Sequence, residues 1–219
     1  GAPLPEEKNN GTWRADNAGR YPDYIWEDSC SRDMYVGWVM AYASVWEVIV
    51  RDPAFSAELK HRLQRDAHAL LEALMAVGPE GYDLEIRDAD GRRTYHGILN
   101  ENSIDRVYLP NAPNGFNAMM AVGIVSGLAW ITGEEVHLSY AQAVLVDQRQ
   151  LLDKAQRFLR LLDFGPGTNF SGYNMLFSAL WLAARYAARS EDRRLVADIV
   201  QQAYASEDRT RLPEEQDQA

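Results

Sequence analysis

Helical segments of two kinds alternate along this chain. Three segments are apolar around the whole helical circumference, and each is followed by one that is apolar along a single stripe. A helix without a polar face must be buried, whereas an amphipathic helix covers a surface. The apolar segments are 33–50, 116–131 and 173–188, and the amphipathic ones are 56–77, 140–162 and 191–204.

This order predicts an all-α fold of helical hairpins in which inner and outer helices alternate. Buried helices surrounded by amphipathic ones form an α/α toroid, whereas an up-down bundle would make every helix one-sided. The chain carries three such hairpins, fewer than a closed ring needs. We therefore expect a partial or complete α/α toroid, either an open half-ring or part of a longer protein that closes it.

Two of the helical segments carry detailed predictions. Gly123 and Gly127 lie in the apolar segment 116–131 and allow a neighbouring helix to approach closely, and Gly133 ends that segment. The segment 56–77 divides into two faces. We expect the inward face to carry Leu59, Leu63, Leu70 and Leu74, and the outward face Arg62, Arg65 and Glu72.

Outside the helices, the sequence predicts one β-hairpin and two polar ends. Residues 82–87 and 93–97 alternate in polarity around Asp90-Gly91, which is typical of a tight hairpin turn. Residues 1–25 are predicted to be an extended N-terminal arm, residues 26–205 the α/α helical domain, and residues 206–219 a polar tail.

Charge and composition argue against several classes of partner. The net charge of −10 disfavours nucleic acid, which binds basic surfaces. No run of about 18 apolar residues lacks a charge or a strong polar break, so we expect no membrane insertion. The single cysteine, Cys30, forms no disulfide within the chain, and the absence of a nearby histidine in the sequence disfavours thiol catalysis.

Clusters of polar residues stand before each apolar segment. If the inner helices run in the same direction, their N-termini meet at one end, where free N–H groups and helix dipoles favour polar or anionic ligands. Capping accounts for one or two residues in each cluster, and the rest are available for binding. We expect ligand-binding roles for Trp26, Glu27, Arg32, Asp105, Arg106, Asn114, Asn117, Asn169 and Asn174.

Catalytic candidates come from the same clusters and from the loop before residue 116. Two carboxylates about 5 to 10 Å apart would indicate a glycoside hydrolase, whereas tyrosine or histidine with asparagine or arginine would suit a polysaccharide lyase. The candidates are Asp28, Asp33, His96, Glu101 and Tyr173.

We expect no cofactor, although oxygen-rich residues leave calcium open as a weak alternative. Asp23, Glu27, Asp28 and Asp33 could supply ligands, but no EF-hand spacing is present. No pair of histidines has zinc spacing. His61 and His68 fall on the amphipathic segment 56–77 and are expected to be solvated, and His137 falls in a short acidic loop.

Three stretches resemble a group of bacterial secreted or surface proteins with α/α-toroid-like helical domains. Residues 27–38 resemble their Asp-Thr-Ser-Ser-Asp-Glu-x-x-Gly-His stretch, residues 86–94 their Asp-x-Asp-Gly-Lys-Pro-Thr hairpin, and residues 169–175 their Asn-x-Ser-x-x-Asn-Met helix entry. Met34 and Trp38 stand where the group often has Glu and His. The resemblance implies a toroid-like fold and an extracellular or periplasmic location, without a settled activity.

Two functions therefore stay open from the sequence. One is binding or processing of a small polar ligand or an oligosaccharide at the N-terminal ends of the inner helices. The other is a non-catalytic structural or interaction domain, joined to further domains of a larger surface protein. Fold alone does not separate them.

Overall fold

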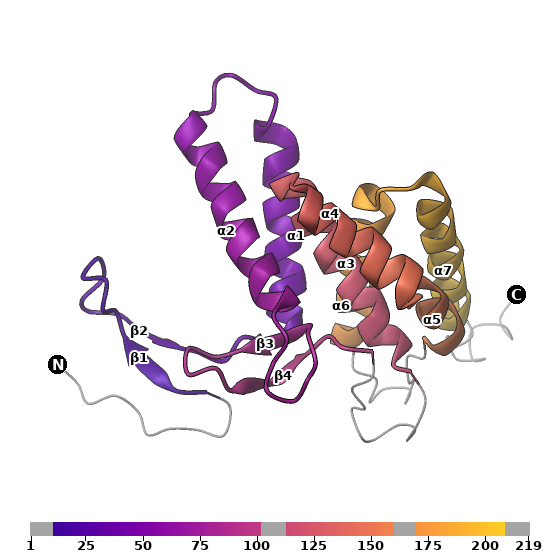
Figure 1. Cartoon of the computed structure of the whole chain (residues 1–219), viewed down its shortest axis with the longest axis horizontal. Helices are drawn as coiled ribbons and strands as arrows, with labels where there is room; N and C mark the ends of the chain where they lie inside the picture. Colours follow the sequence, from indigo (N-terminus) through magenta and orange to yellow (C-terminus); the bar gives the residue numbers. More distant parts are fainter. Residues whose placement is uncertain (1–10, 102–112, 160–169, 209–219) are drawn as a thin grey trace, which may run out of the picture.

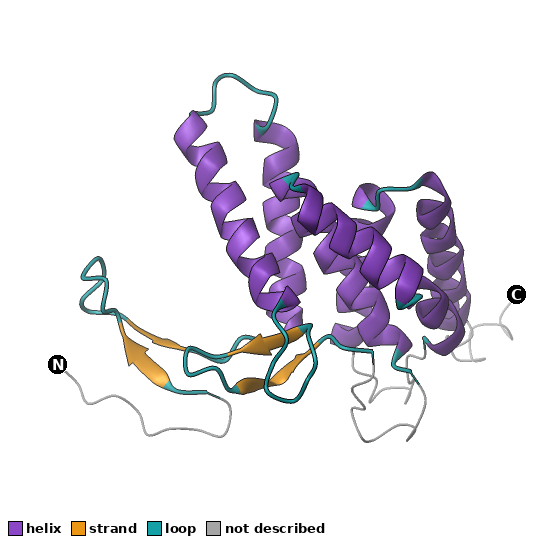
Figure 2. Cartoon of the chain, in the orientation of Figure 1, coloured by secondary structure: helices purple, strands orange, loops and turns teal. Residues whose placement is uncertain are grey.

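A computed structural model describes residues 11–101, 113–159 and 170–208, and these residues are mostly helical (Figures 1 and 2). The long helices are α1 (Arg32–Ile49), α2 (Ala57–Met75), α3 (Gly115–Thr132), α6 (Phe170–Tyr186) and α7 (Ser190–Asp208). The shorter ones are α4 (Glu135–Ser139), the π-helix η1 (Tyr140–Gln148) and α5 (Leu151–Phe158). The strands are β1 (Trp13–Ala15), β2 (Ile25–Glu27), β3 (Glu85–Arg87) and β4 (Arg93–Ile98).

Two antiparallel strand pairs lie below the N-terminal end of α1 (Figure 2). The predicted hairpin is confirmed as β3 paired with β4, and its turn includes Gly91 at a positive φ of 77°. The second pair, β1 with β2 in the register Trp13 to Glu27, was not predicted. It falls within the segment expected to be an extended arm, where strands of only three residues leave little periodic signal in the sequence.

Helix α3 is the centre of the hydrophobic core, as its all-round apolar pattern predicts. Nearly all of its residues are buried, and it packs against α1, α2, α5 and α6. At Gly123 the backbone of α3 lies against the backbone of α6 at Ala179, so a side-chain carbon there would overlap that carbonyl group. Gly127 faces Leu182 and Val39. Gly133 caps the helix in the left-handed conformation, with φ of 66°.

Helices α1, α3 and α6 run in the same direction. At the N-terminal ends of α1 and α3, Arg32 Nη1 donates a hydrogen bond to Asn117 Oδ1 over 2.9 Å. Near the C-terminal ends of α1 and α6, Arg185 Nε donates to Glu47 Oε2 over 2.8 Å. Between these ends, Gly123 of α3 lies against α6. The predicted parallel course of the inner helices is therefore present in this part of the chain.

The prediction that α1 is buried all round is wrong. Its buried face contains Val36, Val39, Ala43, Trp46 and Ile49. Helices α2, α3 and α6 contact this helix without covering its other face, where Trp38 is 60% exposed. Met34, Val45 and Val48 are exposed on the same side. Apolar composition on both faces predicts burial, but one of these faces is exposed to solvent.

Two further predictions need correction at the C-terminal side of α3. Residues 140–162 do not form one amphipathic helix, because η1 ends at Gln148 and Gln150 adopts a positive φ of 54° before α5 begins. The side chain of Arg149 at this break bonds to acidic groups beneath α3. Helix α7 continues to Asp208, so the polar tail predicted from residue 206 begins inside a helix.

The two-faced prediction for residues 56–77 is confirmed for most of α2. Arg62, Arg65 and Glu72 are exposed, and Leu74 is fully buried. Leu63 and Leu70 pack partly buried against the core. Leu59, near the free N-terminal end of the helix, is exposed instead.

Helix α3 is also the one described helix that is long and apolar enough to cross a membrane. In its 18-residue span, 89% of the residues are buried inside the protein. The core helix of a globular domain has the same composition, because both environments exclude water.

Replacing Gly123 with alanine should destabilise the fold. The added methyl group would force α3 away from α6, and overpacking of this kind typically costs about 1–3 kcal/mol of unfolding free energy. Gly37→Ala in α1 is the matched control, since a methyl group there meets nothing within 4 Å. The higher helix propensity of alanine should make that control more stable. Urea denaturation of both variants measures the difference, and equal stability would contradict the close packing.

Candidate functional site

A chain of hydrogen bonds connects the N-terminal ends of α1 and α3. The Asn114 side chain caps α3 by accepting the Asn117 backbone N–H over 3.0 Å. Asn117 is fully buried, and its amide donates to the Asn100 carbonyl over 3.3 Å. Arg32 reaches Asn117 from α1 and also lies over the Phe116 ring, 5.4 Å from the ring centre. The predicted ligand-binding residues Arg32, Asn114 and Asn117 are thus brought together, with their polar groups bonded to protein partners.

An ionic network lies beside these hydrogen bonds. Arg149 donates two hydrogen bonds to Asp83, of 2.8 and 2.9 Å, and two more to Glu101. Lys154 Nζ donates to Glu101 Oε1 over 3.2 Å, and the Tyr140 hydroxyl donates to Asp83 Oδ2 over 2.6 Å. Glu101 is 2% exposed. Removing one partner from such a buried pair leaves an uncompensated charge and strongly destabilises the fold. Each member of the network is therefore needed by the others.

The charges of this network fix its protonation. Burial by itself raises the pKa of Glu101, but hydrogen bonds and charge from Arg149 outweigh burial and lower the pKa overall. The pKa of Tyr140 is raised, first by burial and then by its bond to Asp83. Glu101 is therefore ionised and Tyr140 neutral at physiological pH. Leu84 and Gln150, which adjoin Asp83 and Arg149, adopt positive φ angles of 56° and 54°, a conformation that costs free energy in non-glycine residues.

A second charged cluster joins the two β-hairpins. Buried Asp28 accepts the Thr12 backbone N–H over 2.7 Å and pairs with Arg14. Arg14 also reaches Asp90 over 2.7 Å, and Arg92 pairs with Asp88 over 2.8 Å. Burial by itself raises the pKa of Asp28. The hydrogen bonds from Thr12 and Arg14 outweigh burial, so the pKa of Asp28 is lowered overall.

The same cluster is where a calcium ion could bind. Oxygens of Asp28, Asp88 and Asp90 lie within 4.8 Å of one another, which is compatible with a cation site. Arg14 and Arg92 already bind these carboxylates, so a calcium ion would have to displace a guanidinium group. Among the described residues, Asp23, Glu27 and Asp33 are not part of this group.

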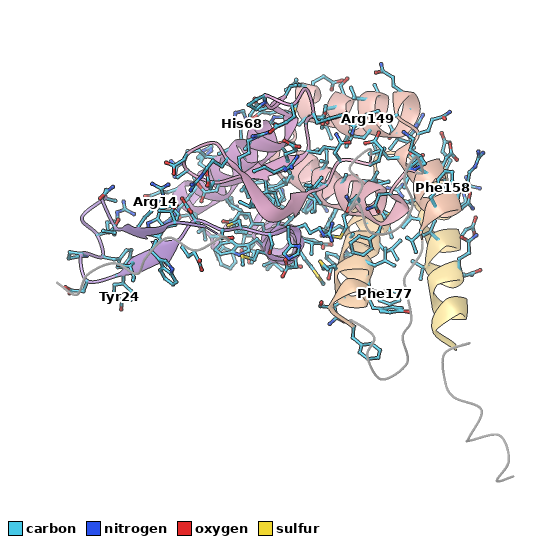
Figure 3. The ribbon with its side chains drawn as sticks, turned by 90° about the horizontal axis from the view of Figure 1, so that it is seen from below. Arg14, Tyr24, His68, Arg149, Phe158 and Phe177 are labelled. Atoms are coloured by element: carbon cyan, nitrogen blue, oxygen red, sulfur yellow. The ribbon has the colours of Figure 1, made fainter. Side chains whose placement is uncertain are left out.

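An aromatic concavity opens at the tip of the β1–β2 hairpin. It has a volume of about 520 Å³ and is lined by Asp16, Tyr21, Tyr24, Ile25 and Trp26. Figure 3 shows Tyr24 at the far end of the hairpin, on the opposite side of the molecule from Arg149. The predicted ligand-binding residue Trp26 therefore belongs to this concavity and not to the helix N-termini.

The remaining predicted residues lie apart from one another. Asp33 is exposed in the first turn of α1 and accepts a hydrogen bond from the Ser31 hydroxyl. His96 is exposed on β4, and Glu27 is half-buried on β2. In the first turn of α6, Tyr173 is buried beside Phe170, and Asn174 is exposed. Asp105, Arg106 and Asn169 lie outside the described residues.

Sequence reasoning missed Arg149, which pairs with Glu101, and the other members of its ionic network. Asp83, Tyr140 and Arg149 come from a loop, from η1 and from the break after it, and no sequence spacing connects them. His137, expected in a short acidic loop, lies in α4 instead and is fully buried. A buried polar side chain needs a hydrogen-bonding partner, but the sequence does not show which distant segment supplies it.

Comparison with known proteins adds no identification. No protein-family model, no curated protein and no solved structure matches this chain.

Replacing Arg149 with methionine should strongly destabilise the fold, because Glu101 and Asp83 would lose their main counter-charge. Breaking a buried ion pair in this way costs about 3–5 kcal/mol. Arg157→Met, at an exposed position of α5, is the control and should change stability by less than about 0.5 kcal/mol. Thermal unfolding at neutral pH measures both, and a small effect of Arg149→Met would show that the network is dispensable.

The same network predicts an acid dependence of stability. Glu101 has a lowered pKa in the folded chain, against an ordinary value of 4.5. Its contribution should be complete above that value and lost as the pH falls through the lowered folded pKa. The stability gap between wild type and Arg149→Met should therefore narrow in acid. A gap that stays constant from neutral pH down to pH ~2 would contradict the assignment.

Proposed function

We propose that this chain binds neutral oligosaccharides through the aromatic concavity of the β1–β2 hairpin. The observation that carries the proposal is the exposure of its rings, since Tyr24 is 70% and Tyr21 62% exposed around an open hollow. Aromatic rings present large apolar faces together with polar edges, which suits the mixed surface of a sugar ring. Exposed apolar groups gathered in this way mark binding surfaces.

The loop that carries these rings is held in place before any ligand arrives. Asp16 accepts backbone N–H groups from Tyr21 over 2.6 Å and from Ala18 over 2.9 Å. The Tyr24 N–H donates to the Tyr21 carbonyl over 2.9 Å, and the two rings meet edge to face at 6.0 Å. A preorganised loop loses less conformational entropy on binding, so its few contacts give more affinity.

Charge favours neutral over acidic sugars at this site. The backbone hydrogen bonds, first from Tyr21 and then from Ala18, lower the pKa of Asp16 and keep it ionised. An ionised carboxylate accepts hydrogen bonds from sugar hydroxyls but repels a uronate. The net charge of −10 adds to that repulsion.

Binding has more support than hydrolysis. A glycosidase needs a carboxylic acid of raised pKa as proton donor. The two buried carboxylates among the catalytic candidates, Asp28 and Glu101, both have lowered pKa values and bind arginine. The proposal places this binding function on a partial α/α toroid in an extracellular or periplasmic protein. The parallel course of α1, α3 and α6 and the resemblance of residues 27–38, 86–94 and 169–175 support that setting.

Trp26→Ala and Tyr24→Ala should each weaken binding of a neutral oligosaccharide by about two- to tenfold, because loss of one stacking ring removes about 0.5–1.5 kcal/mol. Tyr82→Ala removes an exposed tyrosine elsewhere and is the control. Isothermal titration against a panel of neutral and uronate oligosaccharides measures the effect. Binding that tolerates both substitutions, or that prefers uronates, would refute the proposal.

Self-association through α1 is a second candidate function, favoured by its uncovered face. Met34, Trp38, Ala41, Val45 and Val48 recur at alternating steps of four and three residues, the spacing of a coiled-coil seam. Beyond the first turn the one charged residue of α1 is Glu47, which pairs with Arg185. An acidic chain repels its copies, so a charge-neutral apolar face is where a second copy can pack.

Trp38→Glu should abolish this association, because two opposed copies would bury carboxylates against apolar groups. Leu59→Glu, at an exposed apolar position on α2, is the control and should associate like wild type. Sedimentation velocity over a concentration series measures both. A wild-type chain that stays monomeric at its highest soluble concentration would contradict this candidate.

A further inference from the structure

Two histidines and a glutamate from separate helical elements converge beside the C-terminal end of α3. His68 comes from α2, Glu134 precedes α4, and His137 lies within α4. One donor atom from each lies within 4.8 Å of the others. The imidazole rings of His68 and His137 are 5.1 Å apart at an angle of 61°.

We propose that His68, Glu134 and His137 bind a divalent transition-metal ion, with zinc as the best fit. Two histidines and one carboxylate form a common zinc ligand set, which leaves a fourth position for water. The set is separated by 66 residues of sequence between His68 and Glu134, so sequence spacing gave no sign of it.

The distances between the carboxylate oxygens and the imidazole nitrogens lie on either side of those between ligand atoms in a zinc site. Glu134 Oε1 lies 2.9 Å from His68 Nδ1, and Glu134 Oε2 lies 3.8 Å from His137 Nδ1. In a tetrahedral site with bonds of about 2.0–2.2 Å, ligand atoms stand about 3.3–3.5 Å apart. Small movements of two partly exposed side chains, His68 and Glu134, are enough to reach this geometry. The metal ion then replaces the hydrogen bond between His68 and Glu134.

The second nitrogen of His137 has the partner expected for a metal ligand. Its Nε2 lies 2.9 Å from Glu72 Oε1. Metal-binding histidines commonly donate their other N–H to a carboxylate, which fixes the ring and directs the free nitrogen to the metal. Nδ1, the nitrogen left for the metal, lies 2.9 Å from Thr132 Oγ1, so a bound ion would replace that hydrogen bond. His137 itself is 0% exposed, so its orientation is set by the fold.

Electrostatics separates this cluster from the acidic one between the hairpins. Asp28, Asp88 and Asp90 already bind arginine. Within the described part of the chain, Glu72 and Glu134 make no ion pair with arginine or lysine, and their carboxylates lie against His68 and His137. Two carboxylates and two neutral imidazoles balance the charge of one divalent cation. The bound ion would pin the turn between α3 and α4 to α2.

The test titrates Zn²⁺ alone into the full, tag-free chain by calorimetry and follows thermal unfolding with and without Zn²⁺. We expect one ion per chain, a dissociation constant in the micromolar range or tighter, and a rise in melting temperature. His68→Gln should abolish both effects. Glu72→Gln should weaken binding by about 10–100-fold, as expected for a residue that orients a ligand.

His61→Gln changes an exposed histidine on the same helix and is the matched control, with unchanged binding expected. Melting of the metal-free variants checks that each still folds, since His68 and His61 are surface positions. Absence of stoichiometric binding to wild type, or equal binding to His68→Gln and His61→Gln, would overturn the proposal. Cobalt substitution adds a visible absorption band if the coordination is tetrahedral.

Discussion

The contact between the backbones of α3 and α6 at Gly123 and Ala179 is the constraint on which the rest of the structure depends. Because the two helices meet without a side chain between them, α3 can be covered by its neighbours and buried along nearly its whole length. Dense packing of this kind leaves few alternative arrangements for the surrounding helices. Gly127 of α3 likewise lets Val39 of α1 and Leu182 of α6 approach closely, so three parallel helices meet along α3.

That parallel course places polar groups at one end of the helices, and charge pairing then holds the loops there. Arg149 ties Asp83 and Glu101 together beneath α3. The second cluster holds the β-hairpins in place by charge pairing in the same way. Within it, Arg92 donates to the Thr12 hydroxyl over 2.7 Å and so joins the two hairpins. The aromatic concavity lies on the hairpin that this cluster anchors. In the proposed function, the buried charges position the concavity and do not contact the ligand.

The zinc proposal concerns the other end of α3. There the helix stops at Gly133, and the chain turns immediately into α4 against α2. His137 is buried at this turn with both ring nitrogens bonded to protein groups. The two proposed sites therefore lie on separate parts of the fold and stand or fall independently.

Much of the fold could be predicted from the alternation of apolar and amphipathic segments, because burial follows directly from side-chain periodicity. Residues 116–131 form the buried helix that their apolar composition predicts, and the residues around Gly91 form the predicted hairpin. The exposed face of α1 could not be predicted, since Trp38 and Val48 are as apolar as the residues that are buried. Periodicity reports which side chains avoid water, and it does not report whether a neighbour is present to cover them.

The candidate site was predictable only in part. Trp26 is predicted as a ligand-binding residue of the polar cluster before α1, but it lines the concavity of the hairpin. Tyr21 and Tyr24 were passed over because they fell in a segment expected to be an arm. The partners of Glu101 and of His137 come from distant segments, and pairing between such segments is decided by tertiary packing that one sequence does not display. Local spacing rules therefore failed where several elements meet.

The most direct test of the central claim is a ¹H–¹⁵N correlation spectrum recorded during titration with a neutral oligosaccharide. The indole N–H of Trp26 and the backbone amides from Asp16 to Trp26 report on the concavity, and the side chain of Arg149 reports on the ionic network. The account predicts saturable shifts in the first group and none at Arg149. Shifts centred on Arg149, Glu101 and Asn117, with the hairpin unchanged, would contradict it and return the ligand site to the helix N-termini.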